Sequence, residues 1–202
     1  MAAEETYTIT IDVETDWGGR SGENRASLEG LDIILRWLKF YNIKALFFIS
    51  TETMEDFSDD KLAGIKFLDR IKKDGHAIGS HGHFHIQYDS FQRILEDKRL
   101  SESILSAYNI DSFAFRAPKF NKISRHLSLP YSNPSNHISL LKMLWLGHKL
   151  KPTSILYLHP FDLIGGKEPP NLFCKLWYSR PKKALLLFES VLKNYKGVNK
   201  LK

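Results

Sequence analysis

Short apolar runs rich in β-branched residues alternate with longer helical patterns along most of this chain. The runs that we predict as strands are Thr8–Asp12, Lys44–Ser50, His76–Ser80, Phe113–Arg116 and Ser154–Leu158. The predicted helices are Ser27–Tyr41, Asp59–Lys73, Ser90–Ala107, the apolar run Ser139–Leu150, and Pro181–Lys196. Because strands that alternate with helices usually lie parallel in one sheet, the pattern predicts an α/β protein.

The length of the chain favours a single domain. Its 202 residues, of which 43% are hydrophobic, suffice for one sizeable core and are few for two. We therefore expect one domain over residues 1–202, closed by a helix at about 181–196. Stretches rich in Gly, Pro, Ser or Asn predict loops at Gly18–Arg25, Asn121–Asn136 and Gly165–Asn171.

Three histidines fall within five residues, at His81, His83 and His85. In a helix, His81 and His85 would share one face, about one turn apart, whereas in a strand all three would share a face. Two imidazoles on one face are two of the three protein ligands that a catalytic zinc site typically has. A surface run of histidines without a metal is the alternative interpretation of this cluster by itself.

Carboxylates at the end of the first predicted strand favour the metal interpretation. Asp12, Glu14 and Asp16 fall within five residues and precede a Trp-Gly-Gly sequence that does not continue a strand easily. In α/β barrels the C-terminal ends of the strands carry the chemistry. Asp12 and Glu14 share one face of an extended chain, so one can bind a metal while the other accepts a proton. Asp16 can compete as a ligand, although the spacing favours Glu14. Solvated acids that lead into a turn are the alternative.

Two further predicted strands end in ionisable residues. Arg116 lies in the sequence Phe-Arg-Ala-Pro-Lys-Phe of residues 115–120, and His159 lies in Leu-His-Pro-Phe-Asp of residues 158–162. By themselves, such an arginine is usually solvent-facing or in a salt bridge, and such a His-Pro is usually a turn. Together with the acidic and histidine segments they form an ordered set.

This set resembles the motifs of the polysaccharide deacetylases, the NodB-homology or carbohydrate esterase family 4 group. The Asp-x-Glu of residues 12–14 is similar to a variant of the first motif, and residues 75–85 are similar to the second. The Arg-Ala-Pro of residues 116–118 is similar to the third motif, and the Leu-His-Pro of residues 158–160 to the last. The resemblance runs from about residue 8 to residue 162. It implies a distorted, incomplete (β/α) barrel of the NodB-homology type.

The resemblance also implies a metal-dependent hydrolase that removes an N-acyl group, such as acetyl, from a sugar or glycan precursor. It implies the roles of Glu14, His81 and His85 as metal ligands, Asp12 as general base, Arg116 as the partner of Asp12, His159 as general acid, and Lys119 and Phe120 at the oxyanion and substrate side. Zn²⁺ is the expected metal, although cobalt, nickel or iron can fill a set of two histidines and a carboxylate.

The chain departs from the family pattern at several places, among them Ala77, where the second motif usually has Glu, and Lys119, which stands between the proline and the aromatic residue of the third motif. Gly82 stands where the second motif usually has Ser or Thr. The family's fourth motif, with an Asp that orients the acid histidine and a Trp at the acyl pocket, has no counterpart, because residues 121–158 contain no Asp. Trp145 lies in an apolar run and is expected in the core. Asp162 is a candidate substitute partner for His159, although a residue so near in sequence can point away.

Two other functions remain open. One is an amidase or imidase that acts on a cyclic or small-molecule amide with the same fold. The other is a non-catalytic relative that binds a metal or a sugar. The missing fourth motif favours this second alternative, whereas Asp12, Arg116 and His159 argue against it, because binding alone needs neither a base nor an acid.

The charge and the cysteine content limit the partners and the location. The formal net charge is +6, which indicates a solvated basic face or attraction to a phosphate-bearing substrate or an anionic membrane. The sequence has no basic block or nucleic-acid module, so no nucleic-acid partner is expected.

The sequence has no apolar signal segment and no run of about 18 apolar residues, which predicts a cytoplasmic protein without a transmembrane segment. Cys174 is the only cysteine, so an intrachain disulfide is excluded, and the oligomeric state is unknown.

Overall fold

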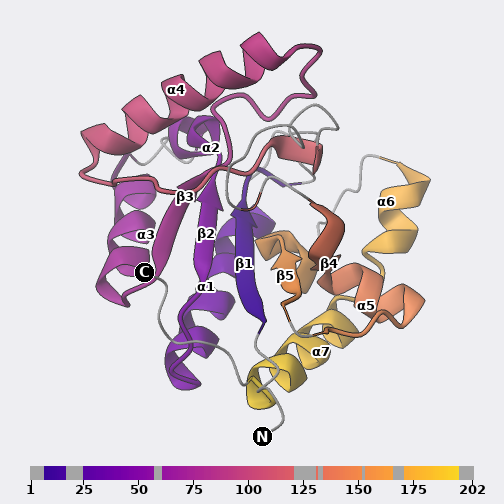
Figure 1. The fold of residues 1–202 in the computed structure, drawn as a ribbon. Coiled ribbons are helices and arrows are strands. Elements are labelled where there is room, and N and C mark those ends of the chain that lie inside the picture. The colour runs from indigo at the N-terminus through magenta and orange to yellow at the C-terminus, as the bar shows by residue number, and fades with distance from the viewer. Residues whose placement is uncertain are drawn as a thin grey trace, which may run out of the picture.

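The computed structural model describes residues 7–16, 25–56, 61–120, 131, 134–151, 153–165 and 171–195. Five strands form one parallel sheet in the order β3-β2-β1-β5-β4 (Figure 1). The strands are β1 Thr8–Val13, β2 Leu46–Ile49, β3 Ala77–Ser80, β4 His137–Ser139 and β5 Ile155–Leu158. The predicted α/β class with a parallel sheet is confirmed.

Helices of very different length lie between these strands and after the last one. The α-helices are α1 Arg25–Phe40, α2 Thr51–Asp56, α3 Lys61–Lys73, α4 Phe91–Ala107, α5 Leu140–Leu146, α6 Leu172–Trp177 and α7 Pro181–Lys193. The 3₁₀ turns are η2 Pro118–Phe120, η4 Pro134–Asn136 and η5 Pro160–Leu163. None of the helices in the described ranges is long and apolar enough to cross a membrane.

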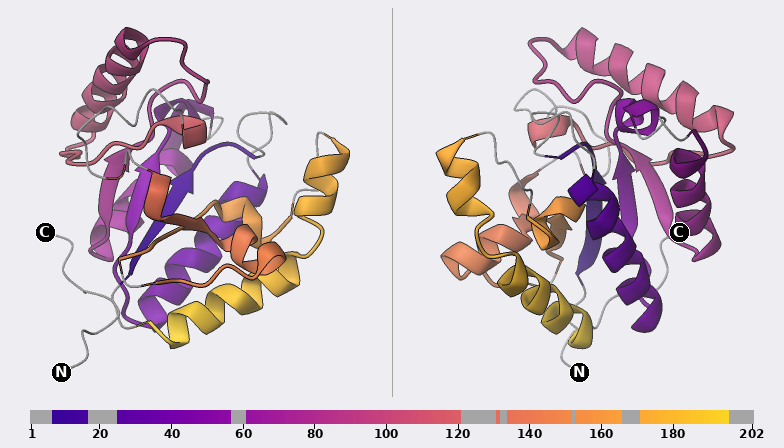
Figure 2. Two further views of the ribbon diagram at one scale, coloured as in Figure 1. Left: turned by 45° about the vertical axis from the view of Figure 1, so that its right-hand side comes forward. Right: turned by 180° about the vertical axis from the view of Figure 1, so that it is seen from behind.

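The main core lies between one face of the sheet and the helices α1, α3 and α7. Ile9, Ile11 and Val13 alternate along β1 and are completely buried in this core. The buried leucines and isoleucines of α1 recur every three or four residues, which gives the helix one apolar face. Figure 2 shows α1 and α7 against this side of the sheet.

The opposite face of the sheet is partly polar and carries the candidate site. Thr10 and Asp12 point to this face because they alternate with the core residues of β1. The chain after Phe113 passes beside β3 but makes only one bridge, between Ser80 and Phe115. The predicted strand Phe113–Arg116 is therefore wrong. Within the described residues the sheet continues beyond β3 only through this bridge, so the barrel is incomplete, as the resemblance implies.

Several boundaries differ from the predicted ones. The elements α2, β4 and α6 were not predicted from the sequence. The helix predicted over Ser139–Leu150 ends at Leu146, because Gly147 adopts a left-handed conformation with φ 66° and caps it. The predicted loops at 18–25, 121–136 and 165–171 lie mostly outside the described residues.

Candidate active site

Three potential metal ligands converge at the C-terminal ends of β1 and β3. The ligand atoms of Glu14, His81 and His85 all lie within 4.8 Å of one another. Nε2 of His81 lies 3.5 Å from Oε2 of Glu14, and Nε2 of His85 also contacts that oxygen. Glu14 and His81 are buried, at 3% and 2% exposure. The structure thus brings together the two histidines and the carboxylate of the sequence analysis.

The donor set suits a divalent cation. Nδ1 of His81 lies 2.8 Å from the main-chain oxygen of Arg116, which can only accept, so Nδ1 carries the proton. The neutral ring of His81 can therefore offer the lone pair of Nε2 to a metal beside Glu14, whose Oε2 is buried and makes no well-formed hydrogen bond within the described residues. Lone pairs that face one another around a buried carboxylate are what a metal ion requires.

The charge state of Glu14 agrees with this reading of the site. Burial acts to raise the pKa of Glu14, but the imidazoles of His85, His159 and His81 outweigh it and hold that pKa well below its ordinary value. Glu14 is therefore ionised at neutral pH and can act as a ligand.

The histidine segment is neither a helix nor a strand. Gly82 adopts φ +80°, so the chain bends directly after His81. A Cβ at Gly82 would lie 2.3 Å from Oδ2 of Asp97 and 2.8 Å from the hydroxyl oxygen of Tyr88. There is no room for the Ser or Thr that the family usually has here. Because of the bend, His83 turns away from the ligand cluster and places Nδ1 3.0 Å from the hydroxyl of Thr51.

Asp97 of α4 supports the bent segment. Its Oδ2 accepts a hydrogen bond from the main-chain N–H of His83 at 2.9 Å, and its Oδ1 accepts one from Phe84 at 3.0 Å. The hydroxyl of Tyr88 also donates to Asp97. Asp97 is only 5% exposed, and both of its oxygens are occupied in this way. No pattern in the sequence indicates Asp97, because no spacing links it to the histidines.

We expect Gly82→Ser to weaken metal binding and to destabilise the protein by about 1–3 kcal/mol, since it combines a strained φ with a clash at Asp97. Competition with a metal chelator and thermal unfolding would measure the two effects. Gly147→Ser is the matched control, because Gly147 also has a positive φ but a Cβ there would meet nothing within 4 Å. Equal losses of metal affinity in both variants would contradict the role of the bend.

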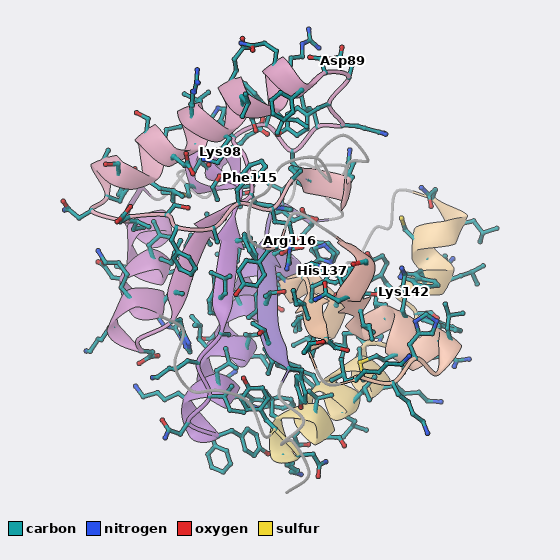
Figure 3. The ribbon with its side chains drawn as sticks, viewed as in Figure 1. Asp89, Lys98, Phe115, Arg116, His137 and Lys142 are labelled. Atoms are coloured by element: carbon teal, nitrogen blue, oxygen red, sulfur yellow. The ribbon has the colours of Figure 1, made fainter. Side chains whose placement is uncertain are left out.

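A buried ion pair holds Asp12. Nη1 of Arg116 lies 2.5 Å from Oδ1 of Asp12, and Nη2 donates to the hydroxyl oxygen of Thr10 at 2.9 Å. The guanidinium lies 4.2 Å from the centre of the Phe48 ring, and Arg116 is 1% exposed. Figure 3 shows Arg116 near the C-terminal ends of β1 and β2. Asp12 is thus fixed at the same end of the sheet as Glu14.

His159 lies between two carboxylates at the end of β5. Its Nε2 is 3.6 Å from Oε1 of Glu14, and its Nδ1 is 3.5 Å from Oδ2 of Asp162. Oδ2 of Asp162 also accepts the main-chain N–H of His159 at 2.8 Å, so the carboxylate faces the ring and does not point away. Burial acts to lower the pKa of His159, but Glu14, Asp162 and Asp12 together raise it to about 10.

Helix α1 contacts both the segment that follows β1 and the turn that follows β5. The carboxylate of Asp16 accepts hydrogen bonds from the main-chain N–H groups of Ala26 and Ser27, at 3.0 and 2.7 Å. Asp16 therefore caps the first turn of α1 and does not compete for the metal. A Cβ at Gly30 would lie 1.9 Å from the main-chain oxygen of Pro160, so only glycine lets α1 approach the turn that follows His159.

Three further residues considered in the sequence are Lys119, Phe120 and Trp145. Lys119 adopts φ 57° in η2, shortly after Arg116, and its side chain is exposed. The side chain of Phe120 lies outside the described part of the chain. Trp145 donates its Nε1–H to the main-chain oxygen of Trp177 at 2.8 Å, so it belongs to the contact between α5 and α6.

The family model for polysaccharide deacetylase matches residues 23–138, more than half of the chain. The chain belongs to this family. The matched residues include His81, His85 and Arg116, whereas Asp12, Glu14 and His159 lie outside them. No curated protein sequence matches the chain significantly.

Solved structures of this family share the fold at low sequence identity. The Xyl-CE4 domain of a multidomain xylanase from the hindgut metagenome of Trinervitermes trinervoides is 21% identical, with TM-score 0.61 over 97% of this chain and 87% of that chain. The Bc1960 peptidoglycan N-acetylglucosamine deacetylase is 17% identical, with TM-score 0.56 over 96% of this chain and 85% of that chain.

A pseudoenzyme has the same fold. BA3943, a CE4 family pseudoenzyme from Bacillus anthracis, is 17% identical, with TM-score 0.60 over 96% of this chain. The match covers 63% of BA3943, so this chain spans less than two thirds of that protein.

Proposed function

We propose that this protein is a metal-dependent hydrolase that removes an N-acyl group from a sugar or glycan precursor. The observation that carries the proposal is the arrangement of Glu14, His81 and His85 beside a carboxylate paired with arginine and a histidine paired with aspartate. A divalent ion, when bound by Glu14, His81 and His85, would lower the pKa of water and polarise an acyl carbonyl.

The other residues of the site divide the proton transfers. Asp12 accepts a proton from the attacking water, and Arg116 pairs with this carboxylate and fixes its orientation. His159 is held protonated by Glu14 and Asp162 and donates its proton to the leaving nitrogen, which an amide needs before it can depart. Asp162 takes the part that an aspartate of the absent fourth motif has in other members of the family.

The identity of the metal and of the substrate is also part of the proposal. Zinc is the metal that most commonly takes histidine and carboxylate ligands at a hydrolytic site. An acetylated glycan is supported by the family and by relatives such as the named peptidoglycan N-acetylglucosamine deacetylase. We further propose that the chain acts as one domain in the cytoplasm, on a precursor that can carry phosphate.

A non-catalytic relative is the second candidate, because the similar structures include a named pseudoenzyme. The described site opposes this alternative. A protein that only binds a metal or a sugar needs no buried Asp12–Arg116 pair beside its ligands and no histidine flanked by carboxylates.

Metal content and deacetylation of an N-acetylglucosamine oligomer test the proposal together. We expect near-stoichiometric metal in the wild type and in Asp12→Asn, but not in His81→Ala, with activity lost in both variants. His83→Gln is the matched control, since His83 lies in the same segment but faces Thr51, and it should keep its metal. A wild-type protein that binds no zinc after reconstitution would refute the proposal.

A further inference from the structure

A basic surface without acidic residues lies at the edge of the molecule that α5 and α6 form. We call it the basic face, and define it as residues 139–151 and 171–183. These two segments contain seven Lys and Arg residues and no Asp or Glu. All seven side chains are exposed, and none forms an ion pair with a described carboxylate. Figures 1 and 2 show α5 and α6 near the β4 edge of the sheet, opposite the β3 edge near which α3 and α4 lie.

The two segments form one continuous surface. The rings of Trp145 and Trp177 stack with centroids 6.3 Å apart, which joins the end of α5 to the end of α6. The guanidinium of Arg180 lies 4.1 Å from the centre of the Trp145 ring, so the start of α7 adds its charge to the same place. Lys142, labelled in Figure 3, lies on the outer part of α5.

Exposed leucines lie among these charges. Leu146 is 59% exposed, Leu172 70% and Leu176 59%. Leu172 and Leu176 are one helical turn apart on α6, with the exposed Lys175 beside them. Leu146 is likewise one turn after Lys142 on α5. Helical leucines bordered by basic side chains are typical of surfaces that bind the headgroup region of a membrane.

The basic face also adjoins the candidate active site. Tyr178, at the end of α6, packs its ring 5.6 Å from the ring of Phe161. Phe161 in turn stacks on His159, with centroids 4.9 Å apart. A membrane in contact with α6 would therefore lie near the turn that carries the proposed general acid.

We propose that the basic face binds an anionic membrane surface, and that the substrate is an N-acylated sugar attached to a membrane lipid. The charge favours this partner, because anionic headgroups complement the seven cations of two segments that contain no Asp or Glu. The leucines favour it over a purely electrostatic partner, since they can insert between the headgroups. The choice of substrate rests on the proposed function, whereas the binding of the membrane does not.

Co-sedimentation with vesicles tests the surface. We expect the wild type to bind vesicles of phosphatidylcholine mixed with phosphatidylglycerol, to bind less at high salt, and not to bind phosphatidylcholine alone. The double variant Lys142→Glu with Lys175→Glu should bind about 25-fold or more weakly, since each lysine near such a surface contributes a factor of about five. The double variant Leu172→Ser with Leu176→Ser should bind the same vesicles about tenfold more weakly.

Matched controls lie on the other side of the molecule. Lys66→Glu on α3 and Leu100→Ser on α4, where Leu100 is 42% exposed, should bind like the wild type. Absence of wild-type binding to anionic vesicles, or equal losses in the controls, would overturn the proposal. So would leucine-dependent self-association of the protein without vesicle binding.

Activity separates the surface from the proposed function. All four variants should retain wild-type activity on a water-soluble acetylated oligomer, because none of these residues contacts the candidate site. Vesicle binding without any deacetylation would support the membrane surface and count against the proposed function. Deacetylation without vesicle binding would overturn the membrane surface alone.

Discussion

Replacing Arg116 by methionine should destabilise the protein by about 3–5 kcal/mol, the effect of removing one partner of a buried ion pair. Arg116 and Asp12 are 1% and 2% exposed, so water cannot solvate a carboxylate that has lost its partner. Methionine fills part of the space of arginine but leaves the charge of Asp12 unpaired. The hydroxyl oxygen of Thr10 also loses the hydrogen bond that it accepts from Arg116. Since a typical domain is stable by about 5–15 kcal/mol, the change is a large fraction of the total. Urea denaturation would measure it.

The double variant Asp12→Asn with Arg116→Met is the control for this prediction. It removes both charges, so it should recover much of the lost stability while remaining inactive. Arg116→Lys should fall between wild type and Arg116→Met, because a single ammonium cannot bond Asp12 and Thr10 with the geometry of a planar guanidinium. Equal destabilisation of the single and the double variant would show that the ion pair is not the cause.

The predictable part of the fold is the part with clear hydrophobic periodicity. The strands β1, β2, β3 and β5 and the helices α1, α3, α4 and α7 each lie at a predicted range, because each buries one face or one continuous run. The missed elements are short: α2 and α6 have six residues each, and β4 has three. A six-residue helix completes fewer than two turns and shows little periodicity.

Tertiary contacts decide the remaining elements. His137–Ser139 is a strand only because it pairs with β5, which lies next to it in the sheet. The apolar run Phe113–Arg116 looks like a strand in the sequence, but its main chain bonds to β3 only around Ser80, through Ala114 and Arg116. Patterns of single residues cannot distinguish these two cases, since the difference lies in the neighbouring strand.

The candidate site shows the same division. The motifs in the sequence located the candidate ligands and the ionisable groups, whereas the groups that support them were visible only in part. Asp97 accepts main-chain hydrogen bonds from the segment that bends at Gly82, and so supports the histidines indirectly. No spacing in the sequence indicates it. Asp162 was visible as a candidate, but its direction depends on the 3₁₀ turn η5, in which it accepts the N–H of His159.

Replacing His159 by glutamine should lower kcat at neutral pH by about 10²–10⁴, the usual contribution of a general acid, and should leave the metal bound. Glutamine can still form hydrogen bonds but cannot deliver a proton. Steady-state kinetics on an acetylated oligomer, together with metal analysis of the same sample, would measure both effects. Loss of metal in this variant would mean that His159 is a ligand and would contradict its proposed role as the general acid.

The charge of Asp162 should set the pH at which His159 loses its proton. In the metal-free protein the neighbouring carboxylates raise the pKa of His159 from 6.5 to about 10. A raised pKa means that the stability from the charged ring is complete below pH 6.5 and is lost as the pH rises through about 10. Asp162→Asn removes one of these charges, so the titration of His159, followed by NMR in the presence of a chelator, should move to lower pH.

If the proposed function is correct, the alkaline limit of kcat/KM in the metal-loaded protein should move in the same direction, because it would report the acid form of His159. Asp89→Asn is the control, since Asp89 pairs with Arg93 on the surface and should leave both curves in place. If Asp162→Asn also leaves the titration of His159 in place, Asp162 only caps the turn. The missing aspartate of the fourth motif would then have no substitute in this chain.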